Sequence, residues 1–149
     1  MASFEYETRF AKLHEKRAEV IAELYRRLVA ADRAMIALLS PIQFSHGLSD
    51  EERQAEVGKC CDSFNRFFLE NQIYFDQCLC VKLEAFNKKL WQAWTDYHTY
   101  ASDEPDVARK RRQTRFQAWK SVSEEAIPLK QEIEKEFRTL LGHRPDGRQ

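Results

Sequence analysis

The sequence is poor in the two residue types that most often interrupt regular structure. Its 149 residues include only 4 Gly and 4 Pro. A β-rich domain of this size needs many turn residues, so their scarcity favours helices joined by few turns. The length suits one domain rather than two, and a hydrophobic fraction of 43% is enough for a sizeable core. We therefore expect a single all-α domain.

Long apolar runs and excess charge are missing too. The longest apolar run, Ala34 to Leu39, falls far short of the roughly 20 residues that span a membrane. The first residues lack the basic start and apolar core of a secretory signal, so we expect a cytoplasmic protein with no membrane partner. Lys and Arg total 24, as do Asp and Glu. This balance disfavours nucleic acid as a partner of the whole surface and requires any charged site to be local.

The 4 cysteines occur as Cys60 with Cys61 and as Cys78 with Cys80. They could form a four-thiolate zinc site, or serve as small buried hydrophobic residues in a reducing compartment. Adjacent cysteines on a helix point about 100° apart, and the two pairs would be offset along neighbouring helices. The spacing favours the second interpretation, so we expect no metal and no cofactor.

The first predicted helix, Phe4 to Ser40, is the longest. Residues that recur every three or four positions form a stripe along one side of it. The stripe consists of Phe10, His14, Arg17, Ile21, Leu24, Leu28, Ala31, Met35 and Leu38. Such a helix is roughly 55 Å long and has to find partners along its length to bury the stripe.

Three more helices are predicted from periodicity and end signals. They cover residues 50–70, 77–101 and 105–141. Ser49 and Glu52 form a capping box before the second helix, and Asp76 is the N-cap of the third. Pro128 predicts a kink near 124–127 in the fourth helix. The expected buried face of the fourth helix is Phe116, Trp119, Ser123, Ala126, Ile133, Phe137 and Leu140.

Short connections between these helices predict an antiparallel up-down-up-down four-helix bundle with long first and fourth helices. The bundle covers residues 1–142, and residues 143–149 form a disordered tail. The long helices either overhang the inner pair or pair with another copy of the chain. Aromatic residues left over on an overhang would favour a homodimer.

A basic run opens the fourth helix and is the most unusual feature of the chain. The run is Arg109, Lys110, Arg111, Arg112 and Arg115, and the bundle places it near Trp94, Tyr97 and Tyr100. One interpretation is a basic–aromatic patch that binds an acidic partner, a phosphate or single-stranded nucleic acid. The other is neutralisation by acids such as Asp50, with the aromatic rings in the core. Charge runs are usually solvated faces, which favours the second interpretation.

Two positions carry an Arg, four further residues and a His. They are Arg9 with His14 and Arg138 with His143. This spacing resembles the Arg-x4–6-His pair of the all-helical HEPN ribonucleases, whose four-helix core is of similar size. The resemblance implies RNA cleavage with one such pair as the catalytic residues.

The function predicted first is non-enzymatic, because we find no assembled catalytic set in the sequence. We expect an interaction module that self-associates or binds a protein through its long outer helices and its basic–aromatic end. The alternative is an RNA-binding protein or a HEPN-like ribonuclease. A ligand-binding bundle would need a core cavity. Asp32, close to the stripe, is expected to pair with a neighbouring Arg rather than to act in catalysis.

Overall fold

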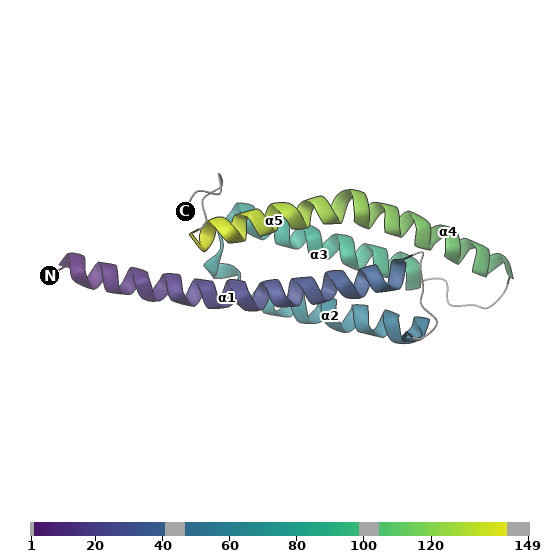
Figure 1. The fold of residues 1–149 in the computed structure, drawn as a ribbon, viewed down its shortest axis with the longest axis horizontal. Helices are drawn as coiled ribbons and strands as arrows, with labels where there is room; N and C mark the ends of the chain where they lie inside the picture. Colours follow the sequence, from purple (N-terminus) through teal and green to yellow (C-terminus); the bar gives the residue numbers. More distant parts are fainter. Residues whose placement is uncertain (1, 41–46, 99–104, 143–149) are drawn as a thin grey trace.

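The computed structural model describes residues 2–40, 47–98 and 105–142, and its regular elements there are all helices (Figure 1). The elements are α1 (Ala2–Leu39), α2 (Asp50–Asn71), the 3-10 helix η1 (Gln72–Tyr74), α3 (Gln77–His98), α4 (Pro105–Ser121), the π-helical turn η2 (Val122–Ala126) and α5 (Ile127–Leu140). Since α4, η2 and α5 follow one another without a break, the described chain has four main helices. This confirms the all-α prediction.

The predicted end signals are present as hydrogen bonds. Ser49 Oγ accepts from the Glu52 amide at 3.2 Å, and Glu52 Oε1 accepts from the Ser49 amide at 3.4 Å. Asp76 Oδ1 accepts from the Leu79 amide at 2.8 Å. Gly142 ends α5 with a φ of 97°, a conformation that favours glycine. The predicted helical residues 99–101 and the predicted tail 143–149 lie outside the described residues.

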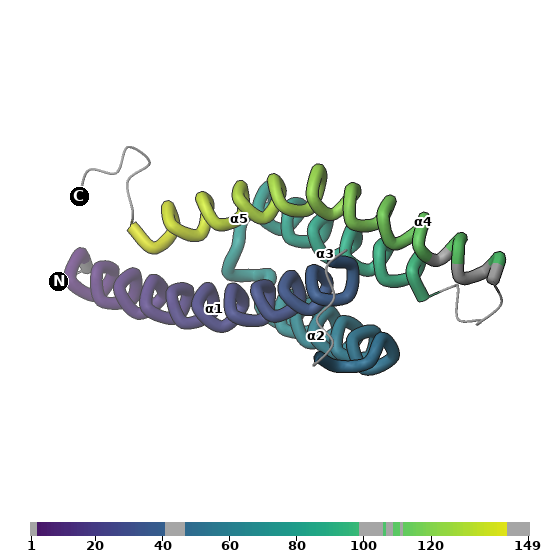
Figure 2. Tube along the Cα trace, turned by 45° about the vertical axis from the view of Figure 1, so that its right-hand side comes forward, coloured from purple at the N-terminus to yellow at the C-terminus, as the bar shows by residue number. Residues whose placement is uncertain are grey.

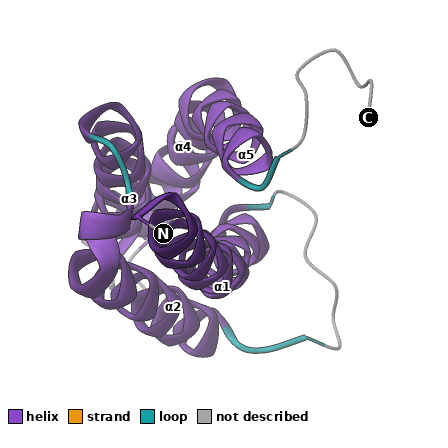
Figure 3. Ribbon diagram, turned by 90° about the vertical axis from the view of Figure 1, so that its left-hand side faces the viewer, coloured by secondary structure: helices purple, strands orange, loops and turns teal. Residues whose placement is uncertain are grey.

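The main helices lie side by side, as the end-on view shows (Figure 3), and their buried side chains form one apolar core. From α1 the core takes Leu24, Leu28, Ala31, Met35 and Leu38, all fully buried. Facing them are Val57, Cys61, Phe64 and Phe68 of α2, Leu83, Phe86 and Leu90 of α3, and Ile133 and Phe137 of α5. The rings of Phe64 and Phe86 meet edge-on with centroids 6.1 Å apart. Apolar burial of this extent is the main force that holds the four helices together.

Two polar contacts join α1 to α5 beside this apolar core. Asp32 is 2% exposed, and its Oδ2 accepts from Lys130 Nζ at 2.9 Å. The Tyr25 hydroxyl donates to Glu134, and this hydrogen bond raises the pKa of Tyr25. The prediction that Asp32 pairs with a neighbouring Arg is wrong. Its side chain lies on the face of α1 that meets α5, whereas the adjacent Arg33 is exposed.

The helix that contains Pro128 is distorted just before the proline. Proline lacks the N–H that the carbonyl of Glu124 would accept, and its ring clashes with that carbonyl. The chain forms the π-helical turn η2 instead, in which the Ile127 amide donates to the Val122 carbonyl. The axis bends in this region (Figure 1). The distortion, at Val122–Ala126, overlaps the predicted kink at 124–127.

The π turn also changes which side of α4 faces the core. A π turn holds one residue more than an α turn, so the face that precedes it shifts by one position. The predicted inward residues Phe116, Trp119 and Ser123 are replaced by Arg115, Ala118 and Val122. Phe116 is 65% exposed, whereas Ala118 and Val122 are buried. The prediction is therefore wrong for Phe116, whereas Trp119 is half-buried against the core and Ala126, Ile133 and Phe137 are buried as predicted.

The N-terminal part of α1 extends beyond the ends of the other helices (purple in Figure 1, and again in Figure 2). Every residue from 3 to 16 is exposed. We call residues 3–16 the arm. Its large apolar side chains are Phe4, Tyr6, Phe10 and Leu13, with exposed fractions of 72%, 70%, 60% and 46%. The described chain thus has the overhang that the sequence offered as one of two alternatives, with aromatic residues on it.

A pair of leucine substitutions tests where the core of one chain begins. Leu28→Ala should lower the free energy of unfolding by about 2–5 kcal/mol, because Leu28 is fully buried. Leu13→Ala, on the exposed arm, should change it by less than about 0.5 kcal/mol in dilute solution. Chemical denaturation followed by circular dichroism measures both. Equal losses for the two variants would contradict the assignment of Leu13 to the arm.

Candidate functional site

A polar network joins the first turn of α2, the last turns of α3 and the middle of α4. The Asp50 carboxylate accepts hydrogen bonds from Arg115 Nη2 at 3.0 Å, from Gln54 Nε2 at 2.7 Å and from the Tyr97 hydroxyl. The Arg115 guanidinium lies over the Tyr97 ring, 5.1 Å from its centroid, and also donates to the Tyr97 hydroxyl. The register shift at η2 turns Arg115 toward this network. Asp50 also suits the positive end of the α2 dipole.

Trp94 and His98 extend the network along α3. Trp94 Nε1 donates to the Gln54 carbonyl at 2.8 Å, and the indole stacks on the His98 ring at 4.6 Å with an interplanar angle of 8°. His98 Nδ1 lies 2.6 Å from Gln54 Oε1. Because the amide nitrogen of Gln54 already donates to Asp50, Oε1 is the acceptor and His98 Nδ1 carries the proton.

This network holds three helices together, and we call it the clamp. Its residues are Asp50, Gln54, Trp94, Tyr97, His98 and Arg115. The Asp50 carboxylate accepts the hydrogen bonds that the side chains of Gln54 and Tyr97 donate. Tyr97 is buried, and Trp94 is half-buried. The Nε atom of Arg115 is buried with no hydrogen-bond partner among the described residues. This arrangement corresponds to the second interpretation of the sequence for Arg115, Tyr97 and Trp94, in which acids neutralise the charge and the rings pack inside.

The rest of the basic run faces outward. Arg109, Lys110 and Arg112 are exposed and form no ion pair with any described residue. Arg109 and Arg112 line a shallow hollow with Gln113, Phe116 and Gln117. The side chain of Arg111 and all of Tyr100 lie outside the described part of the chain. The run is therefore divided, with Arg115 inside the clamp and at least three cations on an exposed face.

The predicted Arg–His pairs are not assembled by the described residues. Arg9 and His14 are both exposed on the arm. Five residues on a helix correspond to about 140° around its axis, so their side chains point apart. Arg138 is exposed on α5, where it lines a hollow with Ile21 and Tyr25. His143 lies outside the described residues.

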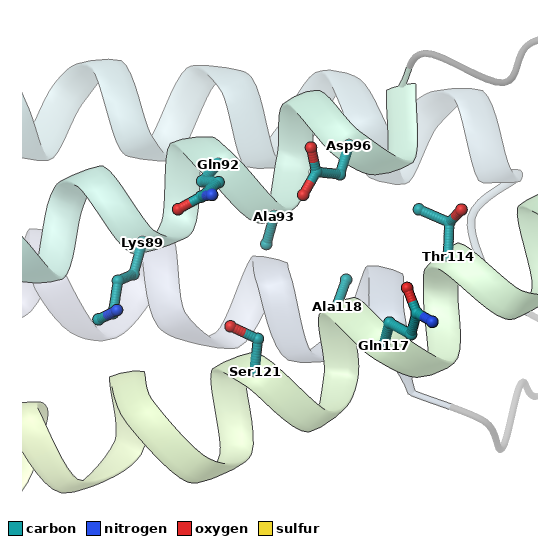
Figure 4. Close-up of a pocket in the computed structure, with 8 residues that line it drawn as sticks. All are labelled: Lys89, Gln92, Ala93, Asp96, Thr114, Gln117, Ala118 and Ser121. Carbon is teal, nitrogen blue, oxygen red and sulfur yellow. The ribbon is translucent and has the colours of Figure 1, made fainter.

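A third hollow, lined mostly by polar side chains, lies between α3 and α4 (Figure 4). Its lining consists of Lys89, Gln92, Ala93, Asp96, Thr114, Gln117, Ala118 and Ser121. Buried Ala93 and Ala118 form its floor. Lys89 Nζ donates to Glu125 at 2.9 Å and Ser121 Oγ donates at 3.1 Å, and these bonds lower the pKa of Glu125. The sequence did not predict this hollow, because small residues indicate a hollow only when the helix that faces them is known.

The cysteine thiols are poor nucleophiles where the chain buries them. Desolvation raises the pKa of Cys61 to about 12 and that of the half-buried Cys60 to about 11. Among the described residues, His, Cys, Asp and Glu side chains form no group of three or more that could hold a metal ion. None of the helices in the described ranges combines the length and the apolar character needed to cross a membrane.

Comparison of the chain with protein-family models, with curated proteins and with solved structures finds no match.

Two substitutions in the basic run test whether Arg115 faces inward while Arg112 faces solvent. Arg115→Gln should lower the free energy of unfolding by about 1–3 kcal/mol, because it removes the charge-assisted hydrogen bond that Asp50 accepts. Arg112→Gln, on the exposed face, should stay within about 0.5 kcal/mol of the parent. Thermal and chemical denaturation measure both. Equal effects would contradict the inward position of Arg115.

Thiol modification tests the burial of the cysteines. Cys78 is exposed and should react first with a thiol reagent, whereas Cys61 should react only when the protein unfolds. Mass spectrometry of the partly modified native protein gives the order. Early labelling of Cys61 would contradict its place in the core.

Proposed function

We propose that the chain is an antiparallel up-down-up-down four-helix bundle that serves as a protein-interaction module in the cytoplasm. The arm of α1 is its binding surface. One observation carries this proposal. The stripe that holds α1 in the core of its own chain continues along the arm, where the described chain leaves it exposed.

The continuity of the stripe follows from its spacing. On this side of α1 the buried side chains are Ile21, Leu24, Leu28, Ala31, Met35 and Leu38 of the predicted stripe, together with Val20 beside them. Tyr6, Phe10, Leu13 and Arg17 continue this spacing toward the N-terminus. All of them therefore lie on one side of the helix. The rings of Tyr6 and Phe10 stack with centroids 6.4 Å apart, which gives the arm one connected apolar surface.

The exposed stripe supplies a driving force for association. Burial of a large apolar side chain stabilises by about 1.5–3 kcal/mol relative to its exposure. A helix of about 15 residues is only marginally stable in water without packing. A partner that covers Tyr6, Phe10 and Leu13 would bury apolar surface and stabilise the arm as a helix.

A second candidate function, RNA binding, is favoured by the outer face of α4. Arg109, Lys110 and Arg112 are exposed there beside the exposed ring of Phe116. Cations next to an aromatic ring are the elements of a single-strand binding surface. The HEPN-like ribonuclease alternative has weaker support, because Arg9 and His14 diverge on the arm.

A pull-down from host lysate, with and without nuclease, distinguishes the two functions. The test variant is Tyr6→Ser with Phe10→Ser and Leu13→Ser, and the matched control is Phe4→Ser, on the opposite side of the arm. The interaction module predicts a protein partner that survives nuclease, binds the control and is lost with the triple variant. Equal capture by the triple variant would contradict the arm as the binding surface.

The same pull-down tests the RNA-binding candidate. The variant here is Arg109→Gln with Lys110→Gln and Arg112→Gln, which leaves the clamp residue Arg115 in place. RNA that is recovered with the parent protein and lost with this variant would favour RNA binding. A partner unaffected by this variant would leave the outer face of α4 as a solvated surface.

A further inference from the structure

We propose that the arm binds the arm of a second copy of this chain, and that the two arms pair antiparallel about a two-fold axis near Phe10. This inference rests on the proposed role of the arm as the binding surface and names its partner. Four observations support it: the distribution of charge along the arm, the position of Arg17, the position of the other helices of the chain and the composition of the tail.

Charge is divided unequally along the arm. Its first half, residues 3–8, has two acids and no base, whereas its second half, residues 9–16, has three bases and one acid. An antiparallel pair places the acidic half of each arm beside the basic half of the other. A parallel pair would place like charges together and would align the two helix dipoles unfavourably. The charge distribution therefore favours the antiparallel orientation.

The charged side chains also lie on matching edges of the stripe. Glu5, Lys12 and Lys16 lie along one edge, and Glu7 and His14 along the other, because each set recurs at the helical spacing. A two-fold axis brings the same edges of the two copies together. Glu5 then faces Lys12 and Lys16 of the second copy, and Glu7 faces its His14. Arg9 approaches Arg9 of the second copy, which is a pair of like charges. This approach occurs at a solvated edge, where water and salt screen the repulsion.

Arg17 lies where the arm meets the bundle. It occupies a stripe position, it is half-buried, and its Nε atom is buried with no hydrogen-bond partner among the described residues. An antiparallel partner centred near Phe10 brings its Glu5 to this level of the helix. The carboxylate would then lie near the positive charge of Arg17 as well as those of Lys12 and Lys16.

The bundle itself limits the orientation. Beyond Arg17 the apolar side chains of the stripe are buried within the same chain. A parallel second α1 would run into the other helices of the chain, whereas an antiparallel one ends where they begin. The two bundles then lie at opposite ends of the paired arms, where they do not collide.

The tail of the same chain lacks the side chains to cover the stripe. Residues 143–149 include no Val, Ile, Leu, Met, Phe, Tyr or Trp. The second copy, by contrast, offers Tyr6, Phe10 and Leu13, the same three apolar side chains at the same spacing. An isologous contact of this kind closes after two copies.

Light scattering after size exclusion, over a dilution series, tests the pairing. The parent and Phe4→Ser should show the mass of two chains at high concentration and of one chain on dilution. Tyr6→Ser with Phe10→Ser and Leu13→Ser should show the mass of one chain throughout, with bundle unfolding unchanged. Replacing Glu5 and Glu7 by Lys should raise the dissociation constant at least tenfold.

A parent protein that shows the mass of one chain at every concentration would overturn self-pairing, as would a dimer that persists in the triple variant. The proposed function is tested separately. A monomer whose lysate partner is lost with the triple variant would retain the arm as a binding surface for another protein.

Disulfide trapping tests the orientation in a background with Cys60→Ser and Cys78→Ser. A mixture of Ser3→Cys and Ala18→Cys chains should form a mixed disulfide, because an antiparallel pair brings these positions together. Each variant alone should remain largely uncrosslinked. Efficient trapping of Ser3→Cys with itself would show a parallel pair and overturn the proposal.

Discussion

The structure depends on one continuous apolar stripe along α1. From Val20 to Leu39 the stripe is the part of the core that the other main helices cover, and its leucines are fully buried. From Tyr6 to Leu13 the same spacing continues without cover. Helix α1 is therefore longer than the part of it that the other main helices cover. From this mismatch we propose the arm as the binding surface and a second copy with the same stripe as its partner.

The second constraint is the π turn that precedes Pro128. By adding one residue to a turn, it rotates the preceding helix so that Arg115 faces Asp50 and Tyr97, while Phe116 faces solvent. The clamp holds the ends of α2 and α3 against α4, at the end of the molecule away from the arm. The clamp and the core hold the main helices together, whereas the arm lies outside both.

Much of the fold could be predicted from local signals. The capping box at Ser49, the cap at Asp76 and the terminal glycine Gly142 mark helix ends through bonds between near neighbours, which a sequence displays directly. The π turn could not be predicted in the same way. Pro128 indicates a distortion but not whether it adds a residue, so the predicted face of α4 is off by one position. Partners distant in sequence, such as Lys130 for Asp32 and Gln54 for His98, depend on that register and on the packing of helices.

Amide hydrogen exchange at two protein concentrations tests whether a second copy covers the arm. If it does, amides of residues 3–16 should exchange slowly in concentrated solution and quickly on dilution, while amides of the core segment of α1 should be protected equally in both. Such a change confined to the arm is the signature of helix pairing there. Fast exchange of the arm at both concentrations would contradict the account.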